Sequence, residues 1–358
     1  MKNIMFVIGC LGGGGAERIV TTVASFLAET NKFNIHILTY YKAVDEYSYS
    51  SKINRVNISN GLIEDYNNMS FSKKIIRIRQ EINRIKPDDI VCFLSHPTVL
   101  TYISLFFLKY RAKIIYCERA NPNFEYGKIN KLRNKIVKRV KKIITQNSGQ
   151  VSCFDDKKQN IKIIPNPMYK ELFENEKKYA LIPKKIVSVG RLTSQKNFEL
   201  GIKAFYEVQK KYKDLEYYIY GEGNKKQELI ELITSLGLDG KVHLMGFEKD
   251  RNVIYGDKDI YLMTSRFEGM PNTLAEAMCY GIPAISTDCD FGPSDLIMNE
   301  EMGILLKDDL VDTVASGIFK MIDNYGEYVN YAKNSRKILN EKYSYEKIMN
   351  EWEKFFEN

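Results

Sequence analysis

Short apolar runs alternate with longer segments of helical periodicity along the chain. The short runs are rich in β-branched and aromatic residues, which is typical of buried parallel strands. The longer segments repeat apolar positions every three or four residues, as amphipathic helices do. In the first half these patterns predict strands at 3–8, 35–39, 90–93, 113–117, 142–145 and 161–164, with helices at 17–29 and 72–85.

The alternation stops at 165–167, a Pro-Asn-Pro sequence, and restarts after a polar connection. The second series predicts strands at 185–189, 217–220, 242–245, 259–263 and 284–287, with helices at 198–212, 226–236 and 273–280. Two βαβ series predict an α/β protein of two Rossmann-like domains with parallel sheets, at 1–167 and 184–343. A last helix at 344–358 is expected to pack back on the first domain. Ligands should bind beyond the carboxyl ends of the strands, in a cleft between the two domains.

The composition fits this interpretation and excludes other classes of protein. A chain of 358 residues with 44% hydrophobic and 27% charged residues is typical of a globular protein with two cores. The six cysteines include no CxxC pair and there are only three histidines, so neither a zinc site nor a disulfide framework is expected. The apolar stretch 99–108 is far shorter than the roughly 20 residues of a membrane span, and the N-terminus lacks signal-peptide features. We therefore expect a cytoplasmic protein.

The net charge of +8 is unevenly distributed. Residues 1–165 carry 27 Lys and Arg against 13 Asp and Glu, whereas residues 166–358 carry 26 against 32. At 128–142 eight cations flank an apolar helical stripe, which predicts a basic helix with one packed and one solvated face. A functional interpretation is a surface for anionic lipid or for a pyrophosphate-bearing acceptor, and we favour the membrane. Nucleic acid is not expected, because no recognition motif accompanies the charge.

A glycine-rich loop at 12–15 follows the first predicted strand and opens the first helix. Glycines in this position let backbone amides approach an anion at a helix N-terminus. The loop lacks the Gly-Lys-Ser/Thr of an ATP-binding P-loop and the G-x-G-x-x-G spacing of a dinucleotide site. A kinase-like ATPase and an NAD-dependent oxidoreductase are therefore disfavoured, and a simple tight turn is the alternative.

The second series carries charged residues where strands end. Arg191 and Lys196 follow the strand at 185–189, and two cations at a strand's carboxyl end are well placed to bind a diphosphate. Lysine and arginine also occur in such loops only to be solvated, so this feature alone is a weak indication.

The segment 266–283 carries a more specific pattern. Pro271 disfavours a continuous helix through Glu268, so this carboxylate should lie in a loop. Asn272 is expected to cap a helix that holds Glu276 in its first turn. Two carboxylates beside an anion site suit the hydroxyl groups of a ribose and a hexose, whereas an isolated pair would more simply serve capping and solvation.

Together these motifs resemble those of the family four retaining glycosyltransferases. Glu268 and Glu276 match the E-x7-E signature of that family. The other matches, in order, are residues 13–18, 118–122 and 164–167 in the first half, and 189–192 with 196–197, 221–223, 246–247, 288 and 292–293 in the second. The resemblance covers nearly the whole chain. It implies a GT-B fold, in which the first domain binds the acceptor and the second the nucleotide-sugar.

The resemblance also implies roles for residues around the donor. Arg191 and Lys196 would bind the diphosphate, Glu276 the ribose and Glu268 the sugar hydroxyls. Backbone near residues 246–247 would contact the base, and the glycine loop would approach the diphosphate from the other domain. The expected donor-binding residues are Gly14, Gly15, Arg191, Lys196, Gly246, Phe247, Glu268, Gly269, Met270, Asn272, Thr273, Leu274 and Glu276.

His96, Glu118 and Arg119 follow strands of the first domain and, with Glu268, are the catalytic candidates. The family implies retention of anomeric configuration, with the donor phosphate helping to take the acceptor proton while these residues orient sugar and acceptor. A lone histidine near a turn is also commonly structural. Residues 288–290 resemble the D-x-D metal motif of another transferase fold, but nothing else of that fold is present. We expect no cofactor and no metal, with two cations in the metal's electrostatic role.

The sequence therefore predicts a transferase that moves a hexose or N-acetylhexosamine from a UDP-sugar to a lipid-diphosphate-linked or polysaccharide acceptor. The product would be a surface glycan such as O-antigen, capsule or exopolysaccharide, made at the inner face of the cytoplasmic membrane by a peripheral enzyme. One alternative is a GDP-mannose-dependent mannosyltransferase. Others are an isomerase or hydrolase of the same fold with no glycosyl acceptor, and a non-catalytic nucleotide- or membrane-binding module.

Overall fold

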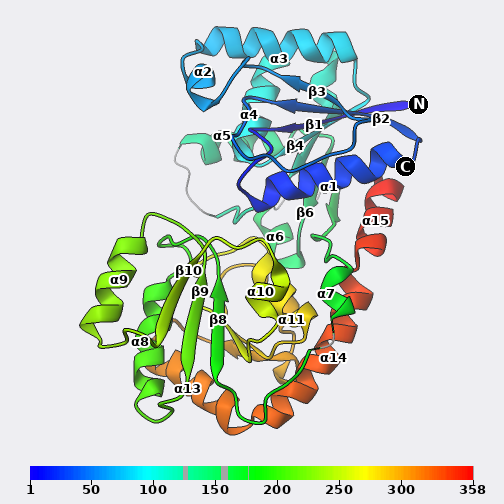
Figure 1. Cartoon of the computed structure of the whole chain (residues 1–358). Coiled ribbons are helices and arrows are strands. Elements are labelled where there is room, and N and C mark those ends of the chain that lie inside the picture. Colours follow the sequence, from blue (N-terminus) through cyan, green and yellow to red (C-terminus); the bar gives the residue numbers. More distant parts are fainter. Residues whose placement is uncertain (124–127, 155–159, 176, 358) are drawn as a thin grey trace. The chain divides into compact units, whose positions relative to one another are not determined.

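The computed structural model describes residues 1–123, 128–154, 160–175 and 177–357. These residues form two compact α/β units (Figure 1). The first unit comprises Met1–Asn166 and Ile348–Asn358, and the second comprises Pro167–Lys347. The last helix, α15 (Tyr345–Glu357), therefore lies mostly in the first unit, although it closes the sequence.

The first unit is built on a seven-stranded sheet in the order β3-β2-β1-β4-β5-β6-β7, and every neighbouring pair is parallel. Its strands are β1 (Lys2–Ile8), β2 (Phe33–Thr39), β3 (Asn54–Asn57), β4 (Asp89–Phe93), β5 (Ile114–Cys117), β6 (Lys142–Thr145) and β7 (Ile161–Ile163). Its helices are α1 (Gly15–Glu29), α2 (Ile63–Asn67), α3 (Phe71–Ile85), α4 (Ser95–Ser104), η1 (Lys109–Lys113), α5 (Lys128–Val137), α6 (Ser148–Val151) and η2 (Ser152–Phe154).

Successive residues of β1 serve the two faces of this sheet, because side chains alternate along a strand. Met5 and Val7 join a buried cluster with residues of α3, α4 and α5. Phe6 instead contacts the ring of Phe356 from α15, with centroids 6.2 Å apart. The first unit is therefore a sheet with helices on both faces, and the C-terminal helix completes one of them.

The second unit is built on a six-stranded sheet in the order β10-β9-β8-β11-β12-β13, again with parallel neighbours. Its strands are β8 (Lys185–Val189), β9 (Glu216–Tyr220), β10 (Val242–Gly246), β11 (Ile260–Met263), β12 (Ala284–Thr287) and β13 (Ile304–Leu306). Its helices are α7 (Glu171–Glu174), α8 (Phe198–Gln209), α9 (Lys226–Ser235), α10 (Arg251–Tyr255), α11 (Asn272–Tyr280), α12 (Pro293–Leu296), η3 (Glu300–Met302), α13 (Val311–Asp323) and α14 (Tyr325–Tyr343).

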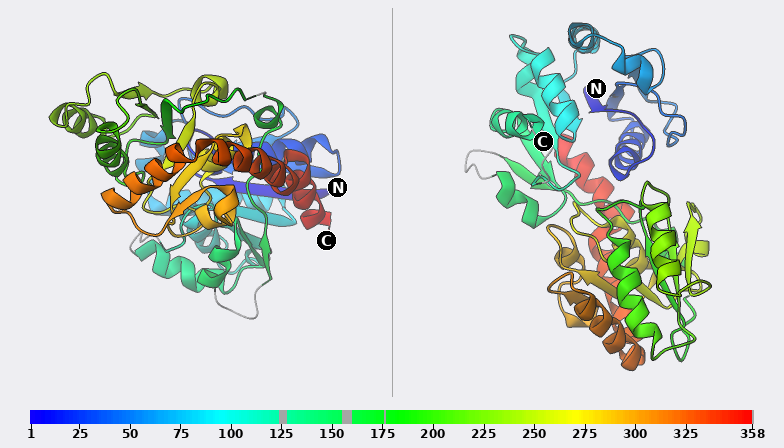
Figure 2. Two further views of the ribbon diagram at one scale, coloured as in Figure 1. Left: turned by 90° about the horizontal axis from the view of Figure 1, so that it is seen from below. Right: turned by 90° about the vertical axis from the view of Figure 1, so that its left-hand side faces the viewer.

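The core of the second unit is also divided by its sheet. Ile186 packs in a cluster with α8, α9 and α13, and its neighbour Val187 packs in the other cluster with α11. The further views in Figure 2 show the helices of each unit around its sheet. Among the described residues, no helix is long and apolar enough to cross a membrane.

The predicted strands and the main predicted helices are present to within a few residues, but short elements and the longer helices α13 and α14 were missed. Among the missed strands, β3 is mostly polar and β13 has only three residues. Helix α4 was also missed, because its sequence contains a proline and several β-branched residues.

The prediction of one basic helix over 128–142 was wrong in two respects. Helix α5 ends at Val137, and Lys142 begins the strand β6. In addition, Arg133 is buried rather than part of a solvated basic face.

Candidate functional site

The switch point of the second unit lies between the adjacent strands β8 and β11. From β8 the chain continues to β9, toward one edge of the sheet, and from β11 it continues to β12, toward the other edge. Ligands of open α/β sheets bind beyond the carboxyl ends of the strands at such a point. The loop after β8 carries Arg191 and Lys196, and the loop after β11 carries Glu268. The sequence-predicted donor residues of these two loops therefore lie at one edge of one sheet.

An ion pair joins the two loops. The Lys196 ammonium lies 2.6 Å from Oε1 of Glu268, and both side chains are largely buried. The backbone of the loops is also connected, since Arg266 N–H donates to the Gln195 carbonyl at 2.9 Å. Arg191, in contrast, is exposed and forms no ion pair within the described residues. A diphosphate would therefore meet one free guanidinium and one ammonium already held by a carboxylate.

Glu276 lies on helix α11, which follows the loop that carries Glu268. Helix α11 begins at Asn272, one residue earlier than expected, so Asn272 is its first residue and not its cap. For the same reason Glu276 lies just beyond the first turn. Its carboxylate is nearly buried, 3.4 Å from an Arg251 guanidinium nitrogen and 3.4 Å from the Tyr255 hydroxyl.

The start of α11 offers backbone rather than side-chain groups. The Thr273 hydroxyl is already engaged, since it accepts from Tyr261 at 2.8 Å and donates to the Val189 carbonyl at 3.2 Å. Leu274 is fully buried, and Met270 is nearly so. The amides of this helix start, where the dipole favours negative charge, are the groups suited to a phosphate or a sugar oxygen.

Glycines allow the loops at this edge to approach one another closely. Gly292 has φ +102°, and a Cβ there would lie 2.4 Å from Cδ of Pro271 and 3.2 Å from the Gly269 carbonyl oxygen. Gly221 has φ +143°, and a Cβ there would lie 1.9 Å from the Gly190 carbonyl oxygen. Neither position tolerates a side chain without moving its neighbour.

The proposed base-contacting pair lies at the end of β10. Gly246 ends this strand with φ +77°, and its carbonyl accepts from the Gly221 amide at 2.7 Å. Phe247 is 70% exposed. Its ring is available to a ligand without rearrangement of the core.

In the first unit, the predicted residues follow three adjacent strands, β1, β4 and β5. Gly14 precedes α1 in extended conformation, and Gly15 begins this helix. His96 is the second residue of α4, and its ring packs edge-on against Tyr40. Partial burial and the nearby Lys74 ammonium lower the pKa of His96, so its ring is neutral at physiological pH. The glycine loop and His96 thus flank the switch point of this sheet.

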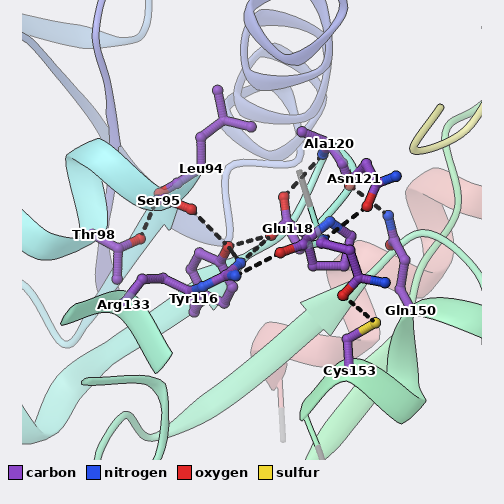
Figure 3. A network of polar contacts seen from close by, with 12 residues as sticks. Leu94, Ser95, Thr98, Tyr116, Glu118, Ala120, Asn121, Arg133, Gln150 and Cys153 are labelled. Carbon is purple, nitrogen blue, oxygen red and sulfur yellow. Dashed lines mark hydrogen bonds and ion pairs between the residues drawn. The ribbon is translucent and has the colours of Figure 1, made fainter. Parts of the chain in front are cut away.

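Glu118 is buried in a polar network rather than open to a ligand (Figure 3). One carboxylate oxygen accepts from the amides of Arg119 and Ala120 at 3.0 and 2.9 Å. The other binds the Tyr116 hydroxyl and lies 3.0 Å from the Arg133 guanidinium. Burial raises the pKa of Glu118, and these donors oppose that shift. In this arrangement Glu118 fixes the loop after β5, and a direct role in the reaction stays a prediction.

Arg119 is also buried, and it is held by neutral groups. Its guanidinium donates to the Ile164 carbonyl at 2.9 Å and to Asn166 Oδ1 at 3.0 Å, and it lies over the ring of Trp352. The other terminal nitrogen, Nη2, has no hydrogen-bond partner among the described residues. Nη2 is therefore unpaired but buried, and a ligand could reach it only after a local rearrangement.

The family comparisons agree with the geometry of the second unit. A family model described as glycosyl transferases group 1 matches residues 170–338, which lie within that unit. This segment is a glycosyl transferases group 1 domain. The predicted enzyme class and family are confirmed.

Relatives and solved structures extend the similarity over both units. An uncharacterized glycosyltransferase of Haemophilus influenzae is 28% identical over 98% of this chain and 99% of its own length. An N-acetylgalactosaminyltransferase of Campylobacter jejuni, named for a diphospho-undecaprenol-linked substrate, is 27% identical over 94% of this chain and 95% of its own. A variant of TarM from Staphylococcus aureus, solved with UDP and α-GlcNAc-glycerol, has a TM-score of 0.80 at 16% identity, with complete coverage of both chains. This last likeness confirms the GT-B fold.

Some residues of the candidate site were not predicted. Arg251 and Tyr255 of α10 contact Glu276, yet they lie outside every matched motif. Arg133 gave a sequence signal that was misinterpreted, because it lies among seven other cations at 128–142. Arg133 falls on the apolar face of the predicted helix, and a cation in that position indicates a buried side chain.

Proposed function

We propose that this glycosyltransferase moves a hexose or N-acetylhexosamine from a UDP-sugar to a lipid-diphosphate-linked acceptor, with retention of anomeric configuration, in the synthesis of a surface glycan. Two similarities support the substrates. The Campylobacter jejuni relative is named for a diphospho-undecaprenol-linked substrate, and the TarM structure holds UDP. The excess of cations in residues 1–165 supports an anionic acceptor and a peripheral position at a membrane.

The observation that carries the proposal is the cation and carboxylate arrangement at the switch point of the second unit. Lys196 and Glu268 form a pair across two loops, and Glu276 lies on the helix that follows. A diphosphate would take the ammonium and the helix amides, which would release Glu268 to accept hydrogen bonds from sugar hydroxyls. Glu276 would accept from the ribose.

Charge on the departing diphosphate would be stabilised by Arg191, Lys196 and the amides at the start of α11. Fixed donors of this kind stabilise developing charge without reorganisation at the moment of reaction. The site in the first unit would orient the acceptor through His96, and a contact with Arg119 would require its buried Nη2 to become accessible. The neutral imidazole has one donor and one acceptor nitrogen, which suits hydroxyl groups.

The decisive experiment measures donor turnover with and without a polyprenyl-diphosphate saccharide. UDP release should depend on the acceptor, and the product should keep the α configuration of the donor by NMR. Release of UDP at the same rate without any acceptor would replace the transferase by a hydrolase of the same fold, and conversion of the UDP-sugar without UDP release would indicate an isomerase.

The alternative donor, GDP-mannose, is distinguished by nucleotide binding. We expect UDP to raise the melting temperature more than GDP at equal concentration, because a ligand that binds the folded state tightly stabilises it by mass action. The opposite order would favour the mannosyltransferase.

A further inference from the structure

Two phenylalanines stand out from the surface of the first unit, between α4 and η1. Phe107 is 92% exposed and Phe106 is 49% exposed, and their rings contact one another edge to face at 4.4 Å. Isolated apolar side chains are ordinary on a protein surface. Two adjacent aromatic rings directed to solvent are not, and such sites mark contacts with an apolar partner.

The backbone holds the pair in this exposed position. Three hydrogen bonds close the connection: Phe106 N–H donates to Ile103, Leu108 N–H to Leu105 and Arg111 N–H to Leu108, at 2.9–3.1 Å. Phe107 has φ +67°, a left-handed conformation that is unusual for a bulky residue. Leu105 is fully buried beside the pair. The rings are therefore presented by a defined turn, and a strained residue forms its tip.

Cations surround the pair. The Arg111 guanidinium lies 5.0 Å from the centroid of Phe106, and Lys109 and Lys113 lie on the same short helix. Lys86 is exposed where α3 ends, and Lys138 and Arg139 are exposed where α5 ends. Helices α3, α4 and α5 all return to the amino ends of parallel strands, so these cations gather at the same end of the sheet as the pair.

The nearby carboxylates cancel only part of this charge, at Lys113. Asp88 lies 3.6 Å from Lys113. Asp89 is buried and already pairs with Lys2 and Lys141. Lys109, Lys138 and Arg139 form no ion pair within the described residues.

We propose that the Phe106–Phe107 turn is the point at which this enzyme inserts into an anionic lipid bilayer. Exposed aromatic rings enter the headgroup and acyl boundary, and the surrounding cations meet anionic headgroups. The inference rests on the proposed function for one step, the choice of a bilayer over another apolar partner. A second copy of the chain fits less well, because two rings supply far less area than the roughly 1,200 Å² of a stable interface. The contact is thus assigned to this turn instead of the predicted basic helix at 128–142.

Insertion can be observed by fluorescence, because the chain has a single tryptophan, Trp352, and it is fully buried. When vesicles of phosphatidylcholine and phosphatidylglycerol are added to Phe107→Trp, the fluorescence emission of the new tryptophan should shift to the blue. Brominated lipid in the vesicles should quench this emission. Leu181→Trp is the matched control, since Leu181 is 99% exposed in the second unit. It should show neither effect. Equal changes in both variants, or none in Phe107→Trp, would overturn the proposal.

Co-sedimentation measures the contribution of the pair. The double substitution Phe106→Ser with Phe107→Ser should weaken binding to the anionic vesicles by at least about tenfold, from the loss of two buried rings. Leu181→Ser with Ile182→Ser should leave binding unchanged. Both variants should keep the wild-type circular dichroism spectrum and the wild-type rate on a detergent-solubilised acceptor.

Three outcomes separate this inference from the proposed function. Unchanged vesicle binding by the folded Phe106/Phe107 variant would refute the docking surface. A wild-type dimer that the same substitutions dissociate, without vesicle binding, would assign the turn to self-association and also refute it. Vesicle binding through the turn, together with no transfer to the solubilised lipid acceptor, would keep the docking surface and refute the proposed acceptor.

Discussion

At the residue scale, some charged side chains of the second unit are engaged in holding loops together, and others are open to a ligand. Lys196 and Glu268 neutralise one another, whereas Arg191 is exposed. In the first unit Glu118 has both oxygens occupied, whereas Arg119 has one buried nitrogen without a hydrogen-bond partner among the described residues. Sequence motifs identify such residues as a set, and only their contacts distinguish the two kinds.

Glu276→Ala should lower kcat/KM for transfer by at least about 100-fold, because a carboxylate that accepts from the donor would be lost. The fold should survive, since Arg251 is partly exposed and can be solvated once its partner is removed. Glu231→Ala, an exposed carboxylate on α9, should behave as wild type. Steady-state kinetics and a thermal melt are sufficient, and full activity of Glu276→Ala would contradict the assigned role.

Arg133→Met should destabilise the protein by about 3–5 kcal/mol, because Glu118 would keep a buried charge without its cation. Lys135→Met on the same helix removes an exposed cation and should change stability by less than about 0.5 kcal/mol. Urea unfolding followed by Trp352 fluorescence reports on this unit. Equal effects of the two substitutions would show that the network of Figure 3 contributes little.

At the element scale, the sequence was sufficient for most of both sheets. Long apolar runs such as 185–189 and 284–287 were located to the residue, because strands buried on both faces leave a continuous signal. An edge strand can leave a weaker one: three of the four residues of β3 are polar, and one edge of this strand is unpaired. The motifs indicated which strand-following loops carry the candidate site residues, but the contacts of Arg251 and Tyr255 with Glu276 depend on the packing of α10.

The loop between Glu268 and α11 should be sensitive to a single methyl group. Gly292→Ala would combine a left-handed backbone with a Cβ 2.4 Å from Pro271, so it should cost about 1–3 kcal/mol and displace this loop. Transfer should then fall more than stability alone explains.

Gly237→Ala provides the matched control for strain without a clash. It also has positive φ, +64°, but no atom lies within 4 Å of its Cβ. It should lose roughly 1 kcal/mol and keep full activity in the folded protein. Equal activity of the two alanine variants under native conditions would mean that the loop tolerates displacement.

At the scale of the whole molecule, the first unit depends on the last residues of the chain. Trp352 and Phe356 of α15 are fully buried beside Phe6 and Phe93 of the sheet. The sequence indicated that the final helix returns to the first domain. It did not indicate how central this helix is, because its aromatic positions resemble any amphipathic face.

Phe356→Ala should therefore lower the stability of the first unit by about 3–5 kcal/mol, the usual cost of emptying a buried phenylalanine site. Leu310→Ala, at a position that is 62% exposed in the second unit, should have almost no effect. Differential scanning calorimetry measures both. A wild-type melting profile for Phe356→Ala would show that α15 is dispensable.

The position of α15 also has a consequence for biosynthesis. A ribosome makes the 167–347 segment, and with it the complete second unit, before the residues that close the first one. Domains of most proteins fold in the order of translation as they leave the ribosome. In this enzyme the second unit is complete before α15 is made, so Phe6, Phe33 and Phe93 of the first unit lack their α15 partners until that helix leaves the ribosome. Aggregation during synthesis should therefore begin at the N-terminal half, and chaperones that shield aromatic surfaces should act there.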